Sequence, residues 1–512
     1  MARTRQLSPT VRHARAAEYL RPGGPWDVPA LDAGLAGSSL RVVDGVRRLD
    51  PPALDAAIDS AATWLAGNGI GPASVVAWQF ANGLEPYLLY RACWRLGAVA
   101  VPVHHAAGEA DVESSLAQVE PDLVVAGPTF PAASRPAAVT LDPGNGTWPP
   151  PGSLPDRPAV NPASPAVVLF TSGSSGTPKA VIHTHRGLLT KARTMAAVHA
   201  LTGDDVVLMP APLAHISGLL NAVLLPAAAG MGVVLMSRWD PAAAVAVIDA
   251  ERVSFMVGPP TFFVGLMGAE GFDPSRVASL RLISSGGSGV TPAFVESASE
   301  TLGCRVKRSY GSTEAPTVTT SGPGDRRDRE RDTDGRPTPG VELRITDPVT
   351  LAEVAAGAAG EVWVRGPEVF EGYLDPAATA EAFGADGWFR TGDLGRVDRD
   401  GWLTITGRMK DVIIRGGENI SAAEVEAALE AHPLVSQAVA VGYPDDRLGQ
   451  RVCAVVVAGG PFDLSVCQAW MAERGITRFK WPERVVQVTT FPLLSSGKVD
   501  RATVAHQVAA PP

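Results

Sequence analysis

The stretch LFTSGSSGTPKAVIHTH, residues 169–185, combines hydroxyl side chains, glycines and a lysine in a pattern suited to anion binding. Glycines let backbone N–H groups turn toward a ligand, hydroxyls add donors, and the ammonium of Lys179 adds positive charge. The expected ligand is a phosphate group. The nucleotide P-loop pattern G-x-x-x-x-G-K-[ST] does not fit, because Gly173 and Gly176 are followed by T-P-K-A. Taken alone, such a Ser/Gly-rich stretch is more often a flexible connection than a binding loop.

Four more stretches carry groups that could act on a bound phosphate compound. SYGSTEA contains Glu314, GWFRTGDLG contains Asp393, TITGRMKD contains Arg408 and PLLSSGKVDR contains Lys498. Each alone has an ordinary explanation, such as a turn cap for the aspartate or a solvated surface charge for the two cations. Their occurrence together in one chain favours a shared function over separate structural explanations.

In this order and spacing the five stretches resemble the adenylate-forming superfamily, which includes acyl-CoA synthetases, nonribosomal adenylation domains and beetle luciferases. The resemblance runs from about residue 35 to about residue 505. TSGSSGTPKAV is similar to the family's phosphate loop T-S-G-[ST]-T-G-x-P-K-G-V and departs from it at Ser175 and Ala180. Neither departure removes a donor or the lysine. The family joins a carboxylate to the α-phosphate of ATP and expels pyrophosphate, so positioning and charge neutralisation should dominate catalysis.

The resemblance implies an ATP site spread over these motifs. Its implied members are Thr171, Ser172, Gly173, Ser174, Ser175, Gly176, Thr177, Lys179, Gly287, Tyr310, Gly311, Ser312, Asp393 and Arg408. The phosphate loop would hold the β- and γ-phosphates. Tyr310 would stack on the adenine, and Asp393 would accept hydrogen bonds from the ribose hydroxyls with Arg408 assisting. The backbone at Gly287 would pass close to the nucleotide.

Four residues are implied to be catalytic. Thr313 would contact the α-phosphate, and Glu314 would ligate Mg²⁺, a hard cation that favours oxygen ligands. Lys498 would reach between the substrate carboxylate and the α-phosphate, where negative charge develops. His215 in PLAHISGL matches a histidine that is frequent at the mouth of the family's acyl pocket, although Ala214 replaces the usual aromatic residue before it. Without the resemblance, a core histidine is an equally good reading.

The resemblance also implies two domains that move. Residues 1–409 would form an N-terminal adenylation domain that binds ATP and the acyl group, and residues 410–512 a mobile C-terminal lid. The hinge would lie at Lys410 in GRMKD. Rotation would withdraw Lys498 and bring RGGENIS to the site, with Gly416 and Gly417 lining the channel for the pantetheine arm of CoA. A plain turn at the glycine pair is the alternative.

The acyl pocket is expected around His215, around Thr261 in VGPPTFF, and at Ser288 and Gly289 in SSGGSG. Amino-acid adenylation domains have F-D-x-S where His215 stands, so an amino acid substrate is not expected. The small residues at 288 and 289 leave room for a ring or a short chain, which favours a medium-chain, alicyclic or aromatic acid. Arg238 either reads a second polar group, as a similarly placed arginine does in malonyl-CoA synthetases, or is a surface charge.

The predicted function is therefore that of an acid–thiol ligase, an AMP-forming acyl-CoA synthetase. It would use ATP, Mg²⁺, CoA and a small carboxylic acid. The alternative is an enzyme that keeps the adenylation step and passes the acyl group to an amine or a carrier protein. A non-catalytic nucleotide sensor on the same fold would be expected to lose Glu314 or Lys498, and both are present.

The elements that position these residues follow an alternating strand and helix pattern, which is typical of parallel α/β sheets. Helices are expected at 51–70 and from 85, and strands at 74–80, up to 103, and at 122–127, 166–170, 206–212, 232–236, 253–260, 280–287 and 304–312. The apolar run 219–236 is expected to divide into a helix, a turn and a strand, because Asn221, Pro226, Gly230 and Gly232 interrupt it. The charged segment 324–337 is expected to be an exposed loop.

The predicted fold class is α/β: a large N-terminal domain of parallel α/β sheets with a β-rich subdomain at 341–408, then a small mobile α+β C-terminal domain. At 512 residues and 46% hydrophobic content the chain should form more than one domain. Its net charge of −9 argues against a nucleic-acid partner, and its four dispersed cysteines read as reduced, apolar thiols. We expect no secretory signal, no transmembrane segment and a cytoplasmic location. A homodimer is compatible with this composition.

Overall fold

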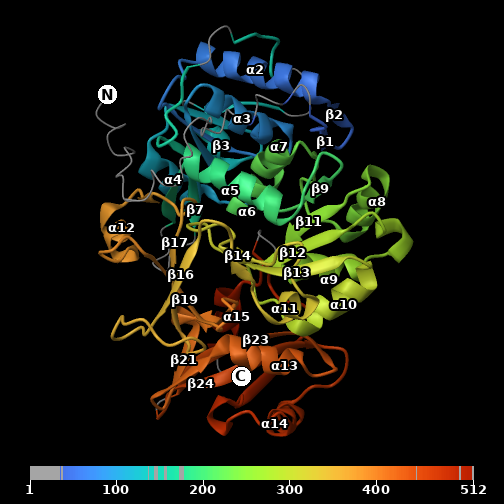
Figure 1. Cartoon of the computed structure of the whole chain (residues 1–512), viewed down its shortest axis with the longest axis vertical. Helices are drawn as coiled ribbons and strands as arrows, with labels where there is room; N and C mark the ends of the chain where they lie inside the picture. Colours follow the sequence, from blue (N-terminus) through green and yellow to red (C-terminus); the bar gives the residue numbers. More distant parts are fainter. Residues whose placement is uncertain are drawn as a thin grey trace.

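Figure 1 shows the computed structural model of the chain, in which a larger α/β part carries a smaller C-terminal domain at its lower end. The structure describes residues 31, 35, 38–135, 138–142, 148–154, 158–171, 178–445, 447–494 and 498–509. The predicted fold class is confirmed: the fold is mixed α/β, with parallel sheets, an antiparallel sheet and a C-terminal α+β domain.

The first sheet has the strand order β18-β8-β7-β4-β3-β5-β6. Its strands are β3 (Val75–Gln79), β4 (Val99–Val103), β5 (Leu123–Ala126), β6 (Ala138–Thr140), β7 (Pro165–Thr171), β8 (Lys179–Thr184) and β18 (Gly372–Tyr373). Strands β3 to β7 run parallel, while β8 and β18 run antiparallel to their neighbours. The carboxyl ends of β4 and β7 therefore meet at one edge of the sheet, beside the start of β8.

The second sheet has the order β15-β14-β13-β12-β11-β9-β10-β1-β2. Its strands are β1 (Val42–Asp44), β2 (Arg47–Leu49), β9 (Val206–Met209), β10 (Gly232–Leu235), β11 (Phe255–Gly258), β12 (Leu282–Gly286), β13 (Arg305–Tyr310), β14 (Thr319–Thr320) and β15 (Arg336–Pro337). From β1 through β10, β9, β11 and β12 to β13 all pairings are parallel. Gly287 and Gly311 directly follow the carboxyl ends of β12 and β13, where ligands of open α/β sheets bind.

Helices fill the space between these two sheets and cover their outer faces (Figure 1). They are α2 (Pro51–Gly67), α3 (Leu84–Arg95), α4 (Glu109–Val119), α5 (His185–Val198), α6 (Ile216–Gly218), α7 (Leu225–Ala229), α8 (Pro241–Glu251), α9 (Pro260–Met267) and α10 (Pro292–Leu302). Residues of α2, α3, α5 and α7 share one core with both sheets. Helix α8 shows the local signals: Asp240 caps it by accepting from the Ala243 amide, and Pro241 follows at the first position.

The apolar run 219–236 divides as the sequence predicts. A π-helical segment, Leu219–Leu224, leads into α7, Gly230 ends that helix with φ of 71°, and β10 follows. Among the helices that the structure describes, none combines the length and the apolar composition needed to cross a membrane. The run is buried core instead.

The third sheet forms the β-rich part and is antiparallel, with the order β16-β17-β19-β20. Its strands are β16 (Glu342–Thr346), β17 (Gly360–Arg365), β19 (Phe389–Val397) and β20 (Leu403–Arg408), and α12 (Pro376–Ala382) lies beside it. The register of β19 on β20 places Asp393 directly opposite Arg408. Two residues that the sequence separates are thereby brought together by a strand pairing.

The C-terminal domain is a sheet of order β22-β21-β24-β23, with β25 beside β24. Its elements are β21 (Val412–Arg415), β22 (Glu418–Ser421), α13 (Ala422–Glu430), β23 (Val435–Asp445), β24 (Gly449–Ala458), α14 (Leu464–Glu473), β25 (Arg484–Val488) and α15 (Arg501–Ala509). The sheet is covered on both faces. Ala438 and Ala440 of β23 pack with α13 and α14, whereas Val439 and Val441 pack with α15, as the two-residue period of a strand requires.

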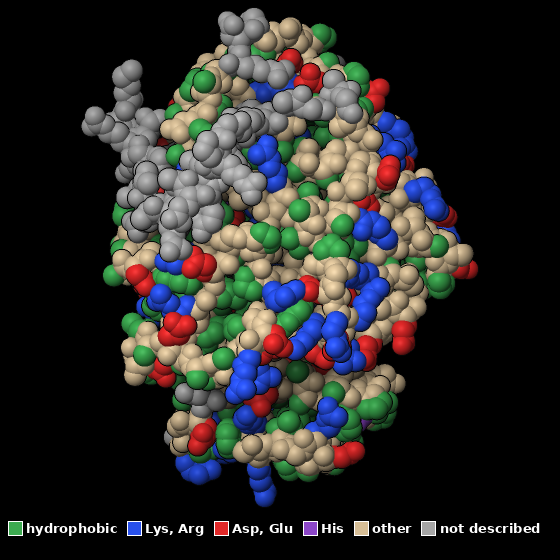
Figure 2. Space-filling model, in the orientation of Figure 1, with side chains coloured by type: hydrophobic (Ala, Val, Ile, Leu, Met, Phe, Trp, Pro, Cys, Tyr) green, Lys and Arg blue, Asp and Glu red, His purple; other side chains and the backbone are tan. Residues whose placement is uncertain are grey.

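The charged segment 324–337 is not the exposed loop that the sequence predicts. Helix α11 (Arg327–Asp332) forms within it, and Glu330 is only 1% exposed. Glu330 is ion-paired with Arg305, and Asp334 lies 2.8 Å from Arg308, both arginines being on β13. Charges can be buried when an opposite charge meets them, which the prediction overlooked. Figure 2 shows basic and acidic side chains interspersed on the face that carries this region.

The four cysteines are buried, as the sequence predicts. Burial raises the pKa of the Cys467 thiol to about 12 and that of Cys304 to about 12. Both thiols therefore stay protonated and pack as small apolar groups.

Candidate active site

Tyr310, Asp393 and Arg408 form one bonded cluster where the second and third sheets meet. The Tyr310 hydroxyl donates to Asp393 Oδ2 at 2.7 Å, and Arg408 Nε lies 2.7 Å from Asp393 Oδ1. Burial raises the pKa of Asp393, while Arg408 and Tyr310 partly offset that effect. Burial also raises the pKa of Tyr310 well above its ordinary value, so its hydroxyl remains a donor. The three predicted nucleotide-binding residues are thus held in place by one another.

Tyr373 brings two other predicted site residues together. Its hydroxyl donates to Glu314 Oε1 at 2.8 Å, and the ammonium of Lys179 lies 5.0 Å from the centre of its ring. Strand β18 carries Tyr373 and pairs with β8, which Lys179 begins. The predicted phosphate-binding lysine and the predicted metal-binding carboxylate therefore both contact the same tyrosine side chain.

The segment between Tyr310 and Glu314 is fixed by backbone contacts. His183 Nε2 donates to the Thr313 carbonyl at 2.8 Å, and burial lowers the pKa of His183 to about 4, which keeps the ring neutral. The Ser312 hydroxyl accepts from the Ala315 amide, which is a local turn contact. A Cβ at Gly311 would lie 2.2 Å from the Thr317 nitrogen, so close backbone packing by itself requires glycine there.

The two ends of the predicted phosphate loop are paired with each other. Thr171 ends β7, Lys179 begins β8, and the two residues face each other across the antiparallel pairing. The residues between them that the resemblance implies, Ser172, Gly173, Ser174, Ser175, Gly176 and Thr177, lie outside the described residues. The loop therefore starts and ends at the carboxyl edge of the first sheet.

Lys498 lies against Gly287, although the two residues are 211 positions apart in the sequence. Gly287 has φ of +81°, and a Cβ on it would lie 3.0 Å from Lys498 Cε and 3.3 Å from its Nζ. The loop of Lys498 is closed by the Leu494 amide, which donates to the Lys498 carbonyl at 2.7 Å. Burial lowers the pKa of Lys498 to about 8; Arg408 lowers it further and Asp393 opposes. The C-terminal domain thus places an ammonium beside the Tyr310, Asp393 and Arg408 cluster.

His215 precedes helix α6 and lies near Lys498. Its Nδ1 accepts from the Ser217 amide at 3.2 Å, which caps the helix. Burial lowers the pKa of His215 to about 3, and the nearby charges of Lys498 and of His104 lower it further. The His215 ring is therefore neutral, and it is close enough to Lys498 and His104 for their charges to act on it.

The other predicted acyl-pocket residues are half-buried or exposed. Thr261 lies half-buried in the first turn of α9, whereas Ser288 and Gly289 are exposed on the turn that also holds Gly287. A Cβ at Gly289 would meet open space. Arg238 is exposed, which favours the surface-charge reading over the recognition of a second polar group.

The predicted hinge and channel residues lie at the start of the C-terminal domain. Lys410 is in a short 3₁₀ turn, Met409–Asp411, between β20 and β21. Gly416 and Gly417 form the exposed turn between β21 and β22, with φ of 59° and 90°. A Cβ at Gly417 would meet nothing within 4 Å. The structure places this turn in solvent and the Lys498 loop at the site.

Sequence reasoning missed three residues of this region. Tyr373 bonds to Glu314, His183 bonds to the Thr313 carbonyl, and the nearby charge of His104 lowers the pKa of His215. Tyr373 in EGYLD carries no motif that would have marked it. His183 and His104 did leave a signal, since both are imidazoles at or just after a buried strand. The pair H-H at 104–105 follows the strand that ends at Val103, and the rings of His104 and His105 lie 4.5 Å apart, centre to centre.

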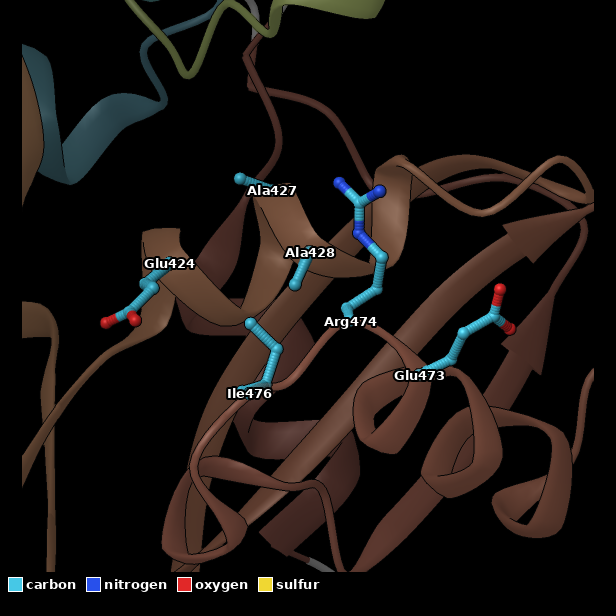
Figure 3. Close-up of a pocket in the computed structure, with 6 residues that line it drawn as sticks. All are labelled: Glu424, Ala427, Ala428, Glu473, Arg474 and Ile476. Carbon is cyan, nitrogen blue, oxygen red and sulfur yellow. The ribbon is translucent and has the colours of Figure 1, made fainter.

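A separate hollow of about 490 Å³ opens on the C-terminal domain (Figure 3). It is lined by Glu424, Ala427, Ala428, Glu473, Arg474 and Ile476. None of these is a predicted site residue, and the hollow lies between α13 and the end of α14. Within the described part of the chain, no group of three or more His, Cys, Asp or Glu side chains is arranged to hold a metal ion.

Comparisons with known proteins identify the family of this chain. Residues 37–374 match the AMP-binding enzyme family and residues 424–498 match the AMP-binding enzyme C-terminal domain. The chain therefore belongs to the AMP-binding enzyme family and is an adenylate-forming ligase in the broad sense.

Individual relatives differ in what they are named for. The chain is 33% identical over 477 residues to the medium-chain fatty-acid–CoA ligase of Escherichia coli strain K12, covering 88% of this chain and 84% of that protein. It resembles the ATP-bound structure of MatB from Rhodopseudomonas palustris with a TM-score of 0.86 and 26% identity, covering 94% of this chain and 99% of that one. The amide bond synthetase McbA from Marinactinospora thermotolerans gives a TM-score of 0.84 and 29% identity, with 94% and 99% coverage.

Proposed function

We propose that this protein is an ATP-dependent carboxylic acid:CoA ligase. It would first join a carboxylic acid to AMP with release of pyrophosphate, and then transfer the acyl group to CoA. The observation that carries the proposal is the placement of Lys498 against Gly287, beside the bonded cluster of Tyr310, Asp393 and Arg408. Adenylation brings a carboxylate and a polyphosphate together, so it needs a surface that positions the nucleotide and a positive charge that offsets the two anions. The three-residue cluster would supply the surface, and the Lys498 ammonium would supply the charge.

The nucleotide would lie along the carboxyl edges of the two parallel sheets. Tyr310 supports the adenine, and Asp393 accepts from the ribose hydroxyls while Arg408 holds that carboxylate in place. Lys179, at the end of the phosphate loop, faces the β- and γ-phosphates. Thr313, whose backbone is held by His183, contacts the α-phosphate.

Among the described residues, the Glu314 carboxylate is the group that fits Mg²⁺ here, because Tyr373 holds it near Lys179. Tyr373 occupies Glu314 Oε1 and thereby orients the carboxylate, so Oε2 can serve as a ligand. One carboxylate with phosphate and water oxygens is a usual way for proteins to hold this ion. Bound there, it would neutralise phosphate charge and assist the departure of pyrophosphate.

In the adenylation step a carboxylate oxygen attacks the α-phosphorus, and the bond from that phosphorus to the bridging oxygen of the β-phosphate breaks. Pyrophosphate leaves with the bonding electrons, and the acyl-adenylate remains. Lys498 stabilises the negative charge that is shared between the carboxylate and the α-phosphate oxygens. Its pKa of about 8 leaves it mostly protonated at neutral pH.

The second step requires the C-terminal domain, residues 410–512, to turn at Lys410 relative to residues 1–409. That rotation would withdraw Lys498 and bring the exposed turn of Gly416 and Gly417 to the site as part of the channel for CoA. The CoA thiol then attacks the acyl carbonyl, the thioester forms, and AMP leaves with the bonding electrons.

The test is a panel of octanoate, cyclohexanecarboxylate, benzoate, phenylacetate and succinate, with ATP and Mg²⁺. Acid-dependent pyrophosphate release would support adenylation, and mass spectrometry with CoA added would detect the thioester. No pyrophosphate release with any acid would count against the proposal.

A second candidate is amide formation, favoured by the likeness to the amide bond synthetase McbA, which matches over 94% of this chain. The adenylation residues would keep the same roles and only the acceptor would change. The same panel distinguishes the two, because supplying an amine in place of CoA would then yield an amide while CoA yields no thioester.

A further inference from the structure

A buried ion pair joins helix α5 to the loop that follows β17. Lys191 Nζ of α5 lies 2.9 Å from Glu368 Oε1, and the two side chains are only 1% and 2% exposed. The Lys191 ammonium also donates to the Thr338 hydroxyl at 3.1 Å and to the Thr317 carbonyl at 3.0 Å. All three of its N–H donors are therefore used, and one of them is bonded to the segment 313–317.

Thr317 is the strained point of that segment. Its φ is 42°, a left-handed conformation that a β-branched residue rarely adopts. The turn is also tightly packed, because a Cβ on Gly311 would lie 2.2 Å from the Thr317 nitrogen. A backbone of this kind persists only where the surrounding structure holds it. The bond from Lys191 to the Thr317 carbonyl is a contact that holds it.

Two neighbouring contacts hold the same segment at other carbonyls. The Phe370 amide, from the loop that also carries Glu368, donates to the Glu314 carbonyl at 2.7 Å. His183, on the strand that leads into α5, donates through Nε2 to the Thr313 carbonyl at 2.8 Å. Each partner of the ion pair therefore belongs to a piece of chain that holds the segment 313–317 at a second point.

Stability alone does not explain why this pair is charged. Glu368 Oε2 is buried and has no hydrogen-bond partner among the described residues. Taking two charges out of water costs free energy, and a well-packed apolar pair of similar volume is often as stable. The charged pair therefore indicates a need for the Lys191 donor itself, which is directed at the Thr317 carbonyl.

We propose that Lys191, together with Glu368, is a positioning device for adenylation. It holds the strained turn at Thr317 and thereby sets Thr313 and Glu314 against the α-phosphate and Mg²⁺. Both members of the pair are buried, so neither touches a substrate. The inference rests on the proposed function, because it concerns residues that act in that reaction, and neither member of the pair lies in a motif that the sequence marks.

The variants must separate position from stability. Lys191→Met alone leaves the Glu368 carboxylate buried without its partner, which is strongly destabilising. The informative variant is the double one, Lys191→Met with Glu368→Leu, which removes both charges and keeps side chains of similar volume. Its melting temperature should lie close to that of wild type. Glu368→Gln keeps the shape of the carboxylate and the Lys191 donor, so its adenylation rate should stay within a few-fold of wild type.

The measurement is acid-dependent pyrophosphate release, with the acid that wild type uses best among octanoate, cyclohexanecarboxylate, benzoate, phenylacetate and succinate. The folded double variant should be about tenfold slower, because small displacements of groups at the reacting centre have effects of at least that size, and it should need severalfold more Mg²⁺ for half-maximal rate. A pair with a structural role alone would recover its activity together with its stability. A wild-type rate and Mg²⁺ curve in the folded double variant, or an equal loss in Glu368→Gln, would overturn the inference.

Thr317→Gly tests whether the pair acts through the strained turn. Glycine adopts a φ of this sign without the steric cost, so the turn then needs its anchor less. In the background of the double variant, Thr317→Gly should therefore recover most of the lost rate. No recovery would mean that the pair does not act through Thr317, which would overturn the inference.

Lys307→Met is the matched control. Lys307 is 1% exposed, and its ammonium donates to the Ser321 carbonyl at 2.5 Å and the Val198 carbonyl at 3.5 Å, neither of which lies in the segment 313–317. At a temperature where this variant is folded, its Mg²⁺ curve should match wild type. A shift equal to that of the double variant would mean that any buried ammonium has this effect, and would overturn the specific role of Lys191.

A readout without turnover keeps the inference separate from the proposed function. Hydrogen exchange of the backbone amides of residues 311–318, followed by mass spectrometry without substrates, should be faster in the double variant and unchanged in Lys307→Met. Unchanged exchange in the double variant would overturn the inference whatever the enzyme does. Faster exchange there, with no pyrophosphate release by wild type for any acid, would support the anchor and count against the proposed function alone.

Discussion

Two parts of the candidate active site are held in place in different ways. One is the cluster of Tyr310, Asp393 and Arg408, and the other is the loop that carries Lys498. The three cluster residues are held by side-chain bonds to one another, at 2.7 Å each, and two of them are set opposite each other by strand register. Lys498 instead belongs to the C-terminal domain, its loop is closed by one backbone bond, and it meets a glycine. The proposed binding surface is therefore held by its own side-chain bonds, whereas the proposed catalytic ammonium comes from the C-terminal domain.

The sharpest test of this comparison removes the delivered charge. Lys498→Ala should lower adenylation by about 10²–10³-fold, the loss expected for one stabiliser of transition-state charge. ATP binding, measured by calorimetry, should stay near wild type because the cluster is intact. Acid-dependent pyrophosphate release reports the rate, and Lys480→Ala, a lysine of the same domain that pairs with Glu424 at 2.6 Å, is the control. A rate within a few-fold of wild type would remove Lys498 from catalysis.

The exposed turn of Gly416 and Gly417 in the C-terminal domain should matter only for the second step. Gly417→Leu is expected to leave adenylation near normal and to slow thioester formation about 10²-fold, since small displacements in a reacting channel have effects of that size. Single-turnover assays with and without CoA measure the two steps.

The backbone at Gly417 calls for a second variant. Its φ of 90° strains a leucine, so Gly417→Asn, which tolerates positive φ better, separates the side chain from the strain. Thermal melts should show that the asparagine variant stays folded. Equal loss in both steps would favour the plain-turn reading of Gly416 and Gly417.

The contact between the two regions can be tested at Gly287. A Cβ there would lie 3.0 Å from Lys498 Cε on a backbone with φ of +81°. Gly287→Ala should therefore lower adenylation about tenfold, which corresponds to about 1.4 kcal/mol. In a Lys498→Ala background the same change should have much less effect, because the contact is already gone. Additive losses in the double variant would mean that Gly287 acts on the nucleotide alone.

How much of this could be read from the sequence depends on what held each residue in place. The sequence predicts Lys498 and Asp393 as site residues because their motifs are local. The hydrogen bond from Tyr373 to Glu314 joins residues 59 positions apart, and no motif near either residue predicts it. The burial of Glu330 likewise depends on Arg305 of a neighbouring strand. The division of 219–236 was predictable because glycine and proline act on their own backbone.

The pH dependence of the adenylation rate should also report the charge on Lys498. Because burial lowers the pKa of Lys498 to about 8, its ammonium is charged below that pH and neutral above it. If the charged form is required, adenylation should fall about tenfold between about pH 7 and about pH 9. Lys498→Arg, which stays charged, should be slower overall but lose this fall. A flat wild-type profile over that range would contradict the role of the ammonium.

The smallest expected effect belongs to the pre-organised side of the site. Glu314→Gln keeps the shape of the side chain and removes its charge, so we expect the Mg²⁺ concentration for half-maximal adenylation to rise severalfold. Tyr373→Phe is the matched control: it removes the hydroxyl that donates to Glu314 Oε1 and leaves the carboxylate charged. If charge is what holds the ion, the glutamine variant should shift the Mg²⁺ curve far more than the phenylalanine variant. Equal shifts would mean that the orientation set by Tyr373 matters more than the charge, and unchanged curves in both would move the metal away from Glu314.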